Sequence, residues 1–80
     1  MRKLNLYTTS ACHLCEVVEA LIAPELINHE VDLVLIEISD SDDLVEKYGL
    51  RIPVLRFEES GLELDWPFDQ PQFLDFLTAS

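Results

Sequence analysis

The chain has 80 residues, of which 49% are hydrophobic, and its 16 acidic and 5 basic side chains give a formal net charge of −11. This length predicts one small domain, residues 1–80, with enough apolar residues for a core. The few bases form no cluster that could follow a phosphate backbone, so nucleic acid and anionic membrane surfaces are disfavoured as partners. We expect a monomer.

The sequence predicts a cytoplasmic protein. No stretch approaches the roughly 18 apolar residues of a membrane-spanning helix. Near the start, Asn5 and the polar run at residues 8–10 interrupt any signal-peptide core. In a reducing compartment, two cysteines are more consistent with a redox-cycling pair than with a permanent structural bridge.

The first half of the chain predicts a strand, a helix and a second strand. Leucines alternate with other side chains over residues 3–7, as in a strand. A helix is expected from about Cys12, and Pro24 is expected to end or kink it. Its apolar residues recur at intervals of three and four: Leu14, Val17, Val18, Leu21 and Ile22. Residues 31–38 form a second strand that is apolar on both faces, which is typical of parallel sheets.

The second half adds a helix, a hairpin and a final helix. Ser41 or Asp40 caps a helix over residues 42–48, and Gly49 is expected to end it in the left-handed conformation. Two strands are predicted at 54–57 and 62–66, followed by a helix at 70–78. The order β-α-β-α-β-β-α predicts an α/β fold with a mixed four-stranded sheet flanked by helices on both faces.

The motif Cys12-His13-Leu14-Cys15 lies between the first strand and the first helix. Thiols at i and i+3 share one helical turn, so they can close a disulfide with little backbone movement. Unpaired N–H groups and the helix dipole favour a thiolate at the N-terminal sulfur. A thiolate is a nucleophile, so the motif predicts redox chemistry first.

Metal binding and an inactive cysteine pair are the alternatives. A zinc site needs about four ligands, and only Cys12, Cys15, His13 and His29 are available, without the expected spacing. We therefore expect no metal and no bound cofactor. His13 either lowers the pKa of Cys12 when protonated or is an ordinary exposed histidine. His29 is expected on the surface, in a turn with no partner.

The motif, the order of elements and Pro53 at the start of the third strand together resemble the thioredoxin superfamily in its glutaredoxin-like form. Residues 7–15 are similar to the glutaredoxin active-site stretch, and Ile52-Pro53 is similar to the family's cis-proline dipeptide. The resemblance implies that Cys12 attacks a disulfide and that Cys15 resolves the mixed disulfide. The position of Cys15 inside the first turn also predicts that it is the more covered of the two.

The resemblance also implies a substrate-binding segment. A cis bond before Pro53 would bring the chain edge toward Cys12 and leave backbone groups of Ile52 free to pair with an extended substrate. The alternative is an ordinary proline at a strand start. We take Ile52, Pro53 and His13 as candidate substrate-binding residues, and we expect Arg51 to pair with a surface acid rather than with a substrate carboxylate.

The chain departs from glutaredoxins where they hold glutathione. Their usual lysine is Thr9 here, their proline after the first cysteine is His13, and their Gly-Gly pair is replaced by residues 64–67. We expect protein or small-molecule disulfides as partners, with glutathione doubtful. The predicted function is a small dithiol–disulfide oxidoreductase. The alternatives are a binding module of the same fold and an iron–sulfur cluster carrier.

Overall fold

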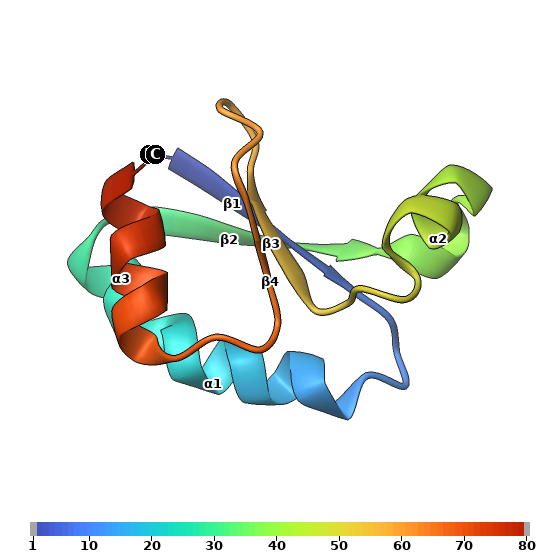
Figure 1. The fold of residues 1–80 in the computed structure, drawn as a ribbon, viewed down its shortest axis with the longest axis horizontal. Helices are drawn as coiled ribbons and strands as arrows, with labels where there is room; N and C mark the ends of the chain where they lie inside the picture. The colour runs from blue at the N-terminus through green and yellow to red at the C-terminus, as the bar shows by residue number, and fades with distance from the viewer. Residues whose placement is uncertain (1, 80) are drawn as a thin grey trace.

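The computed structural model describes residues 2–79, which form a four-stranded sheet flanked by helices (Figure 1). The strands are β1 (Arg2–Thr8), β2 (Val31–Glu37), β3 (Val54–Phe57) and β4 (Glu63–Asp65). Their order is β2-β1-β3-β4; β1 is parallel to β2, and β3 is antiparallel to both β1 and β4. The predicted mixed sheet and element order are confirmed.

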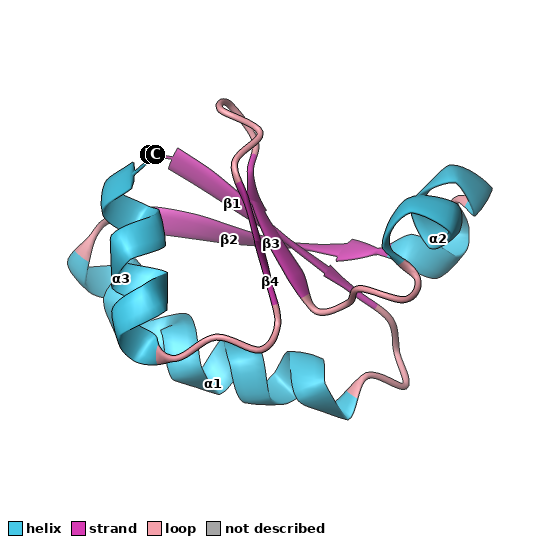
Figure 2. Cartoon of the chain, in the orientation of Figure 1, coloured by secondary structure: helices cyan, strands magenta, loops and turns pink. Residues whose placement is uncertain are grey.

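Helices α1 (His13–Asn28) and α3 (Gln70–Ala79) cover one face of the sheet and lie together in Figure 2. Side chains alternate along a strand, so β1 turns Leu4 and Leu6 toward these helices, and both leucines are fully buried. The aromatic residues of α3, Phe73 and Phe76, complete this core. No helix of the described residues is long and apolar enough to cross a membrane.

The opposite face carries a smaller cluster that joins β1 and β3 to α2 (Asp42–Tyr48) and the 3-10 helix η1 (Ile38–Asp40). Its buried members are Tyr7, Ile38, Tyr48 and Val54. The Oγ atom of Ser41 accepts the N–H of Leu44 at 3.4 Å, so Ser41 is the cap of α2 as predicted.

Helix α1 continues through Pro24 to Asn28, so of the two outcomes expected at this proline the structure excludes an end to the helix. The inward face of α1 differs from its prediction. Leu14 and Val17 are 46% and 40% exposed, although both were predicted to face inward. The buried face includes the second cysteine and continues at helical spacing from it: Cys15, Val18, Ile22 and Leu26.

Three smaller predictions are also wrong. Gly49 has φ -54 and ψ -33, which is helical and not left-handed; a Cβ there would meet the carbonyl oxygen of Val45. Strand β2 is at an edge of the sheet, and its Leu35 is 54% exposed rather than covered. His29 is exposed as expected, but it has a partner, since its Nδ1 lies 2.9 Å from the carbonyl oxygen of Glu25 at the end of α1.

Candidate active site

Strand register brings three segments to one end of the sheet. Thr8 pairs with Glu37 across the parallel strands, and Tyr7 pairs with Val54 across the antiparallel strands. The loop that carries the cysteines follows Thr8, and Pro53 directly precedes Val54. Both loops therefore leave the sheet at the end where β2 also finishes, as the β1–α1 and α2–β3 connections show in Figure 1.

Cys12 and Cys15 form a disulfide with a Cα–Cα distance of 5.3 Å. Cys12 is the N-cap of α1, and its Sγ accepts the backbone N–H of Cys15 at 3.1 Å. The N–H of Cys12 itself donates to the carbonyl oxygen of Thr9 at 3.0 Å. Cys15 is buried at 3% exposure, whereas Cys12 is half-buried. Cys12 is therefore the more accessible residue of the pair, as expected.

The position of the Cys12 sulfur determines its electrostatic environment. It occupies the place where an N-cap oxygen usually accepts a hydrogen bond from the first turn of a helix. The disulfide sulfur here stands where the thiolate of the reduced protein would lie. Because the N–H groups of the first turn and the helix dipole both favour negative charge, this position stabilises a thiolate.

His13 begins α1, and its side chain is exposed to solvent. Its Nδ1 lies 3.6 Å from a carboxylate oxygen of Glu16, one turn further along the helix. The described ion-pair partner of this histidine is thus an acid and not a cysteine sulfur. A role for His13 in substrate binding stays a prediction.

The Ile52–Pro53 peptide bond is cis, as the resemblance implied. The Trp66–Pro67 bond is also cis, which the sequence did not predict. The two segments are joined, because the N–H of Trp66 donates to the carbonyl oxygen of Pro53 at 3.1 Å. The expectation of free backbone groups at Ile52 is wrong for its N–H, which donates to the carbonyl oxygen of Tyr48 at 3.0 Å.

Arg51 holds the segment before the proline against β4. Its Nε and one terminal nitrogen donate to the two carboxylate oxygens of Asp65 at 2.9 and 2.8 Å. The same terminal nitrogen donates to Glu63 at 2.7 Å. Hydrogen bonds to Asp65 and then to Glu63 raise the pKa of the guanidinium. Arg51 thus pairs with acids, as expected, and the alternation of Glu63 and Asp65 on one face of β4 was the available sequence signal.

Tyr48 connects this ion-pair network to β1. Its ring stacks on Tyr7 with 4.1 Å between centroids, and its hydroxyl donates to Glu63 at 2.7 Å. Burial, and then the bond to Glu63, raise the pKa of the Tyr48 phenol. Burial would raise the pKa of Glu63, but hydrogen bonds from Arg51 and Tyr48 outweigh it and lower that pKa. The loop that carries Ile52 is therefore fixed by charged and aromatic contacts.

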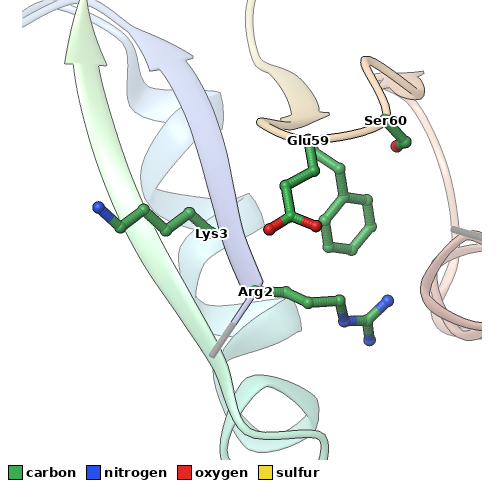
Figure 3. A pocket seen from close by; sticks show the side chains of 5 residues that line it. Arg2, Lys3, Glu59 and Ser60 are labelled. Carbon is green, nitrogen blue, oxygen red and sulfur yellow. The ribbon is translucent and has the colours of Figure 1, made fainter.

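A pocket of about 80 Å³ lies at the other end of β1 (Figure 3). The side chain of Arg2 lies 4.9 Å over the ring of Phe57 and donates to the carbonyl oxygen of Leu77 at 3.1 Å. Because β1 begins at this pocket and the cysteines follow its opposite end, the pocket is separate from the disulfide. Its lining residues are Arg2, Lys3, Phe57, Glu59 and Ser60.

The fold and the site define a class of protein. A mixed four-stranded sheet flanked by helices, with a disulfide at the start of the first helix and a cis-proline before β3, is a thioredoxin-like domain. The family model of the Glutaredoxin-like domain (DUF836) matches residues 3–78, so the chain belongs to that family. No curated protein matches the chain.

Solved structures support this assignment. An X-ray structure of a structural genomics target protein from X. campestris is 38% identical, with a TM-score of 0.75, and the match covers 96% of this chain and 97% of that one. A solution NMR structure of a protein from Nitrosomonas europaea is 29% identical, with a TM-score of 0.80 and coverages of 94% and 89%. A structure described as a malarial protein has a TM-score of 0.71 at 8% identity, with coverages of 99% and 96%, and shows the fold alone.

Proposed function

We propose that this protein is a small dithiol–disulfide oxidoreductase in which Cys12 attacks and Cys15 resolves. The disulfide at the N-terminus of α1 carries the proposal, because it joins an accessible sulfur at the helix cap to a buried one. The N–H donated by Cys15 to the Cys12 sulfur supports the assignment of the nucleophile. Membership in a glutaredoxin-like family is consistent with this redox role.

The reduction half-reaction needs only the two cysteines and a substrate disulfide. The Cys12 thiolate attacks one substrate sulfur, which breaks the substrate disulfide and releases its other sulfur as a thiolate. Cys15, after losing its proton to solvent, then attacks the Cys12 sulfur and releases the second substrate thiolate. Two electrons pass to the substrate, and the Cys12–Cys15 disulfide forms. A dithiol donor restores the reduced pair, and the same steps in reverse oxidise a dithiol partner.

The partner class that we propose is a protein or small-molecule disulfide, with glutathione a poor partner. Glutathione is anionic, and the chain has a net charge of −11 with Thr9 at the position where glutaredoxins usually have a lysine. The nearby cation Arg51 is already engaged by Glu63 and Asp65. A partner segment would pair with the carbonyl of Ile52, since the N–H of that residue has an internal acceptor. The proposed location is the cytoplasm, and no cofactor is required.

Trapping of the mixed disulfide tests the proposal. Reduced Cys15→Ser protein is mixed with oxidised insulin, a generic protein disulfide, and the products are separated without reductant. We expect a covalent adduct through Cys12 that dithiothreitol releases, because the resolving thiol is missing. The reduced wild-type chain should instead release free insulin thiols and become oxidised itself.

Cys12→Ser is the matched control, since it retains one thiol and the same fold. It should form no adduct under conditions in which Cys15→Ser reacts. Equal trapping by both variants would contradict the assignment of attacker and resolver. Absence of exchange in the wild-type chain, even after full reduction, would contradict the oxidoreductase proposal and favour a binding module of the same fold.

A further inference from the structure

Tyr48 is the last residue of α2, and its backbone fixes the turn that follows the helix. Its carbonyl oxygen accepts the N–H of Arg51 at 2.8 Å and the N–H of Ile52 at 3.0 Å. The side chain of Ile52 also packs against the buried cluster to which Tyr48 belongs, and Pro53 is fully buried. The candidate substrate-binding segment therefore takes its position from the residue that ends α2.

The side chain of Tyr48 contacts two strands of the sheet, and the residue is only 2% exposed. Its ring stacks on Tyr7 of β1 with 4.1 Å between centroids, and the loop that carries the cysteines begins after the next residue of that strand, Thr8. Its hydroxyl donates to one carboxylate oxygen of Glu63 in β4 at 2.7 Å. The other oxygen of Glu63 accepts from Arg51 at 2.7 Å. The hydroxyl bond thus closes a ring of contacts that includes the substrate-binding segment.

We propose that Tyr48 is a positioning residue for the partner, because it holds Ile52 in place for pairing with an extended polypeptide segment. The inference rests on the proposed function in taking this segment as the place where a protein disulfide binds. It goes further by assigning the preference for disulfides carried by a polypeptide to a buried hydrogen bond between Tyr48 and Glu63. A polypeptide brings backbone N–H groups for which the Ile52 carbonyl is an acceptor, whereas a small disulfide without peptide groups cannot form this bond.

The Tyr48 hydroxyl can be removed without changing the charge of the chain. Tyr48→Phe deletes the hydrogen bond to Glu63 but retains the ring that stacks on Tyr7. It also retains the backbone carbonyl that accepts the N–H groups of Arg51 and Ile52. The variant therefore removes one of the links between the turn and β4. A less ordered turn is expected to weaken pairing with a polypeptide more than it weakens attack by the cysteine sulfur on a small disulfide.

The experiment mixes each reduced protein with an excess of one disulfide and follows the oxidation of the protein. Two electrons pass from the cysteine pair to the added disulfide, so no other electron donor is needed. The two disulfides are oxidised insulin and hydroxyethyl disulfide, which has no peptide groups. The measured quantity is the ratio of the second-order rate constants, insulin over hydroxyethyl disulfide. We expect Tyr48→Phe to lower this ratio by about threefold or more, the size expected for loss of one buried hydrogen bond.

Glu63 gives an independent test from the other side of the bond, and it decides the question if Tyr48→Phe does not fold. Glu63→Gln and Glu63→Ala both remove one negative charge, but only glutamine keeps an oxygen that can accept the Tyr48 hydroxyl. We expect the ratio to fall further in Glu63→Ala than in Glu63→Gln. Adding Tyr48→Phe to Glu63→Ala should lower the ratio no further, because the bond is already absent.

Phe76→Leu is the control for lost stability, since Phe76 belongs to the core on the other face of the sheet. This variant should lower thermal stability and leave the ratio unchanged. An unchanged ratio in Tyr48→Phe, including a fall of both rate constants by the same factor, would overturn the inference, because Tyr48 would then serve the fold alone. A fall of the same size in Phe76→Leu would overturn it as well. If the reduced wild-type chain is oxidised by neither disulfide, the proposed function itself fails, and the inference fails with it.

Discussion

The backbone N–H of Cys15 donates a hydrogen bond to the sulfur of Cys12 at 3.1 Å, so the first helix is capped by its own candidate nucleophile. The same short segment therefore sets both the start of α1 and the chemistry of the pair. In the reduced protein this N–H can stabilise the Cys12 thiolate. Cys15 is buried inside the first turn and does not occupy the N-cap position, so its thiolate is not stabilised in the same way.

We predict that Cys12 is the more reactive thiol of the reduced protein. Its pKa should lie below the free value of about 8.5, because the helix N–H groups and dipole stabilise its thiolate. The pH dependence of alkylation in Cys15→Ser gives this pKa directly. In Cys12→Ser the remaining thiol should alkylate about tenfold more slowly at pH 7, because burial raises the pKa of a thiol. Faster alkylation of Cys15 than of Cys12 would reverse the assignment of attacker and resolver.

We predict that the chain has low turnover in a glutathione-coupled disulfide reduction assay. We expect the substitution Thr9→Lys to raise this turnover. The lysine would place a cation near the disulfide of a chain whose charge is −11. An opposite charge close to an anionic ligand is expected to improve kcat/KM by about threefold or more. Thr9→Gln is the uncharged control. Turnover of the unmodified chain comparable to that of an ordinary dithiol glutaredoxin would refute the claim about glutathione and leave the fold intact.

The ion-pair network around Arg51 is predicted to stabilise the domain. Arg51→Met should lower the free energy of unfolding at pH 7 by roughly 1 kcal/mol, since the arginine is partly exposed but makes paired hydrogen bonds with Asp65. For a domain of this size, that loss corresponds to a fall in Tm of about 4–8 °C. Arg56→Met is the matched control, because its Nε lies 3.8 Å from Glu63 and makes a weaker contact.

The effect of Arg51→Met is expected to depend on pH through Glu63. The pKa of Glu63 is lowered in the folded protein, so its stabilising contribution is fully present above the unfolded value of about 4.3. The contribution is lost as the pH falls through the lower folded pKa. Thermal melts at a series of pH values should therefore show the difference between wild type and Arg51→Met shrinking below about pH 4. A difference that grows on acidification would contradict this role of Glu63.

The fold was accessible from sequence because local signals agreed with one another. Alternating residues in β1, the Ser41 cap and the spacing of Phe73 and Phe76 each indicate one element, and together they indicate one topology. The inward face of α1 was placed wrongly because Leu14 and Val17 satisfy the same spacing as the true face. Cys15 belongs to that true face, where it occupies a core position as a small apolar residue.

The cysteine pair was accessible from sequence, but its surroundings were not. Glu37 comes to lie beside Thr8, where the cysteine loop begins, only through the parallel register of β1 and β2. Arg51 meets Asp65 only through the antiparallel pairing of β3 and β4. The internal acceptor for the N–H of Ile52 is a carbonyl of the preceding turn, which no side-chain pattern reveals.

Redox titration is the sharpest test of whether Cys12 and Cys15 exchange electrons with a partner. The protein is equilibrated in buffers that contain reduced and oxidised dithiothreitol in a series of ratios. Each sample is quenched with acid, its free thiols are alkylated, and its mass is measured by mass spectrometry. We expect one reversible two-electron transition between a doubly alkylated dithiol and an unalkylated disulfide, and we expect this transition to be absent from both Cys12→Ser and Cys15→Ser. A pair that remains fully alkylated in the most oxidising buffer, or that cannot be reduced in the native protein, would contradict the claim that these cysteines exchange electrons with a partner.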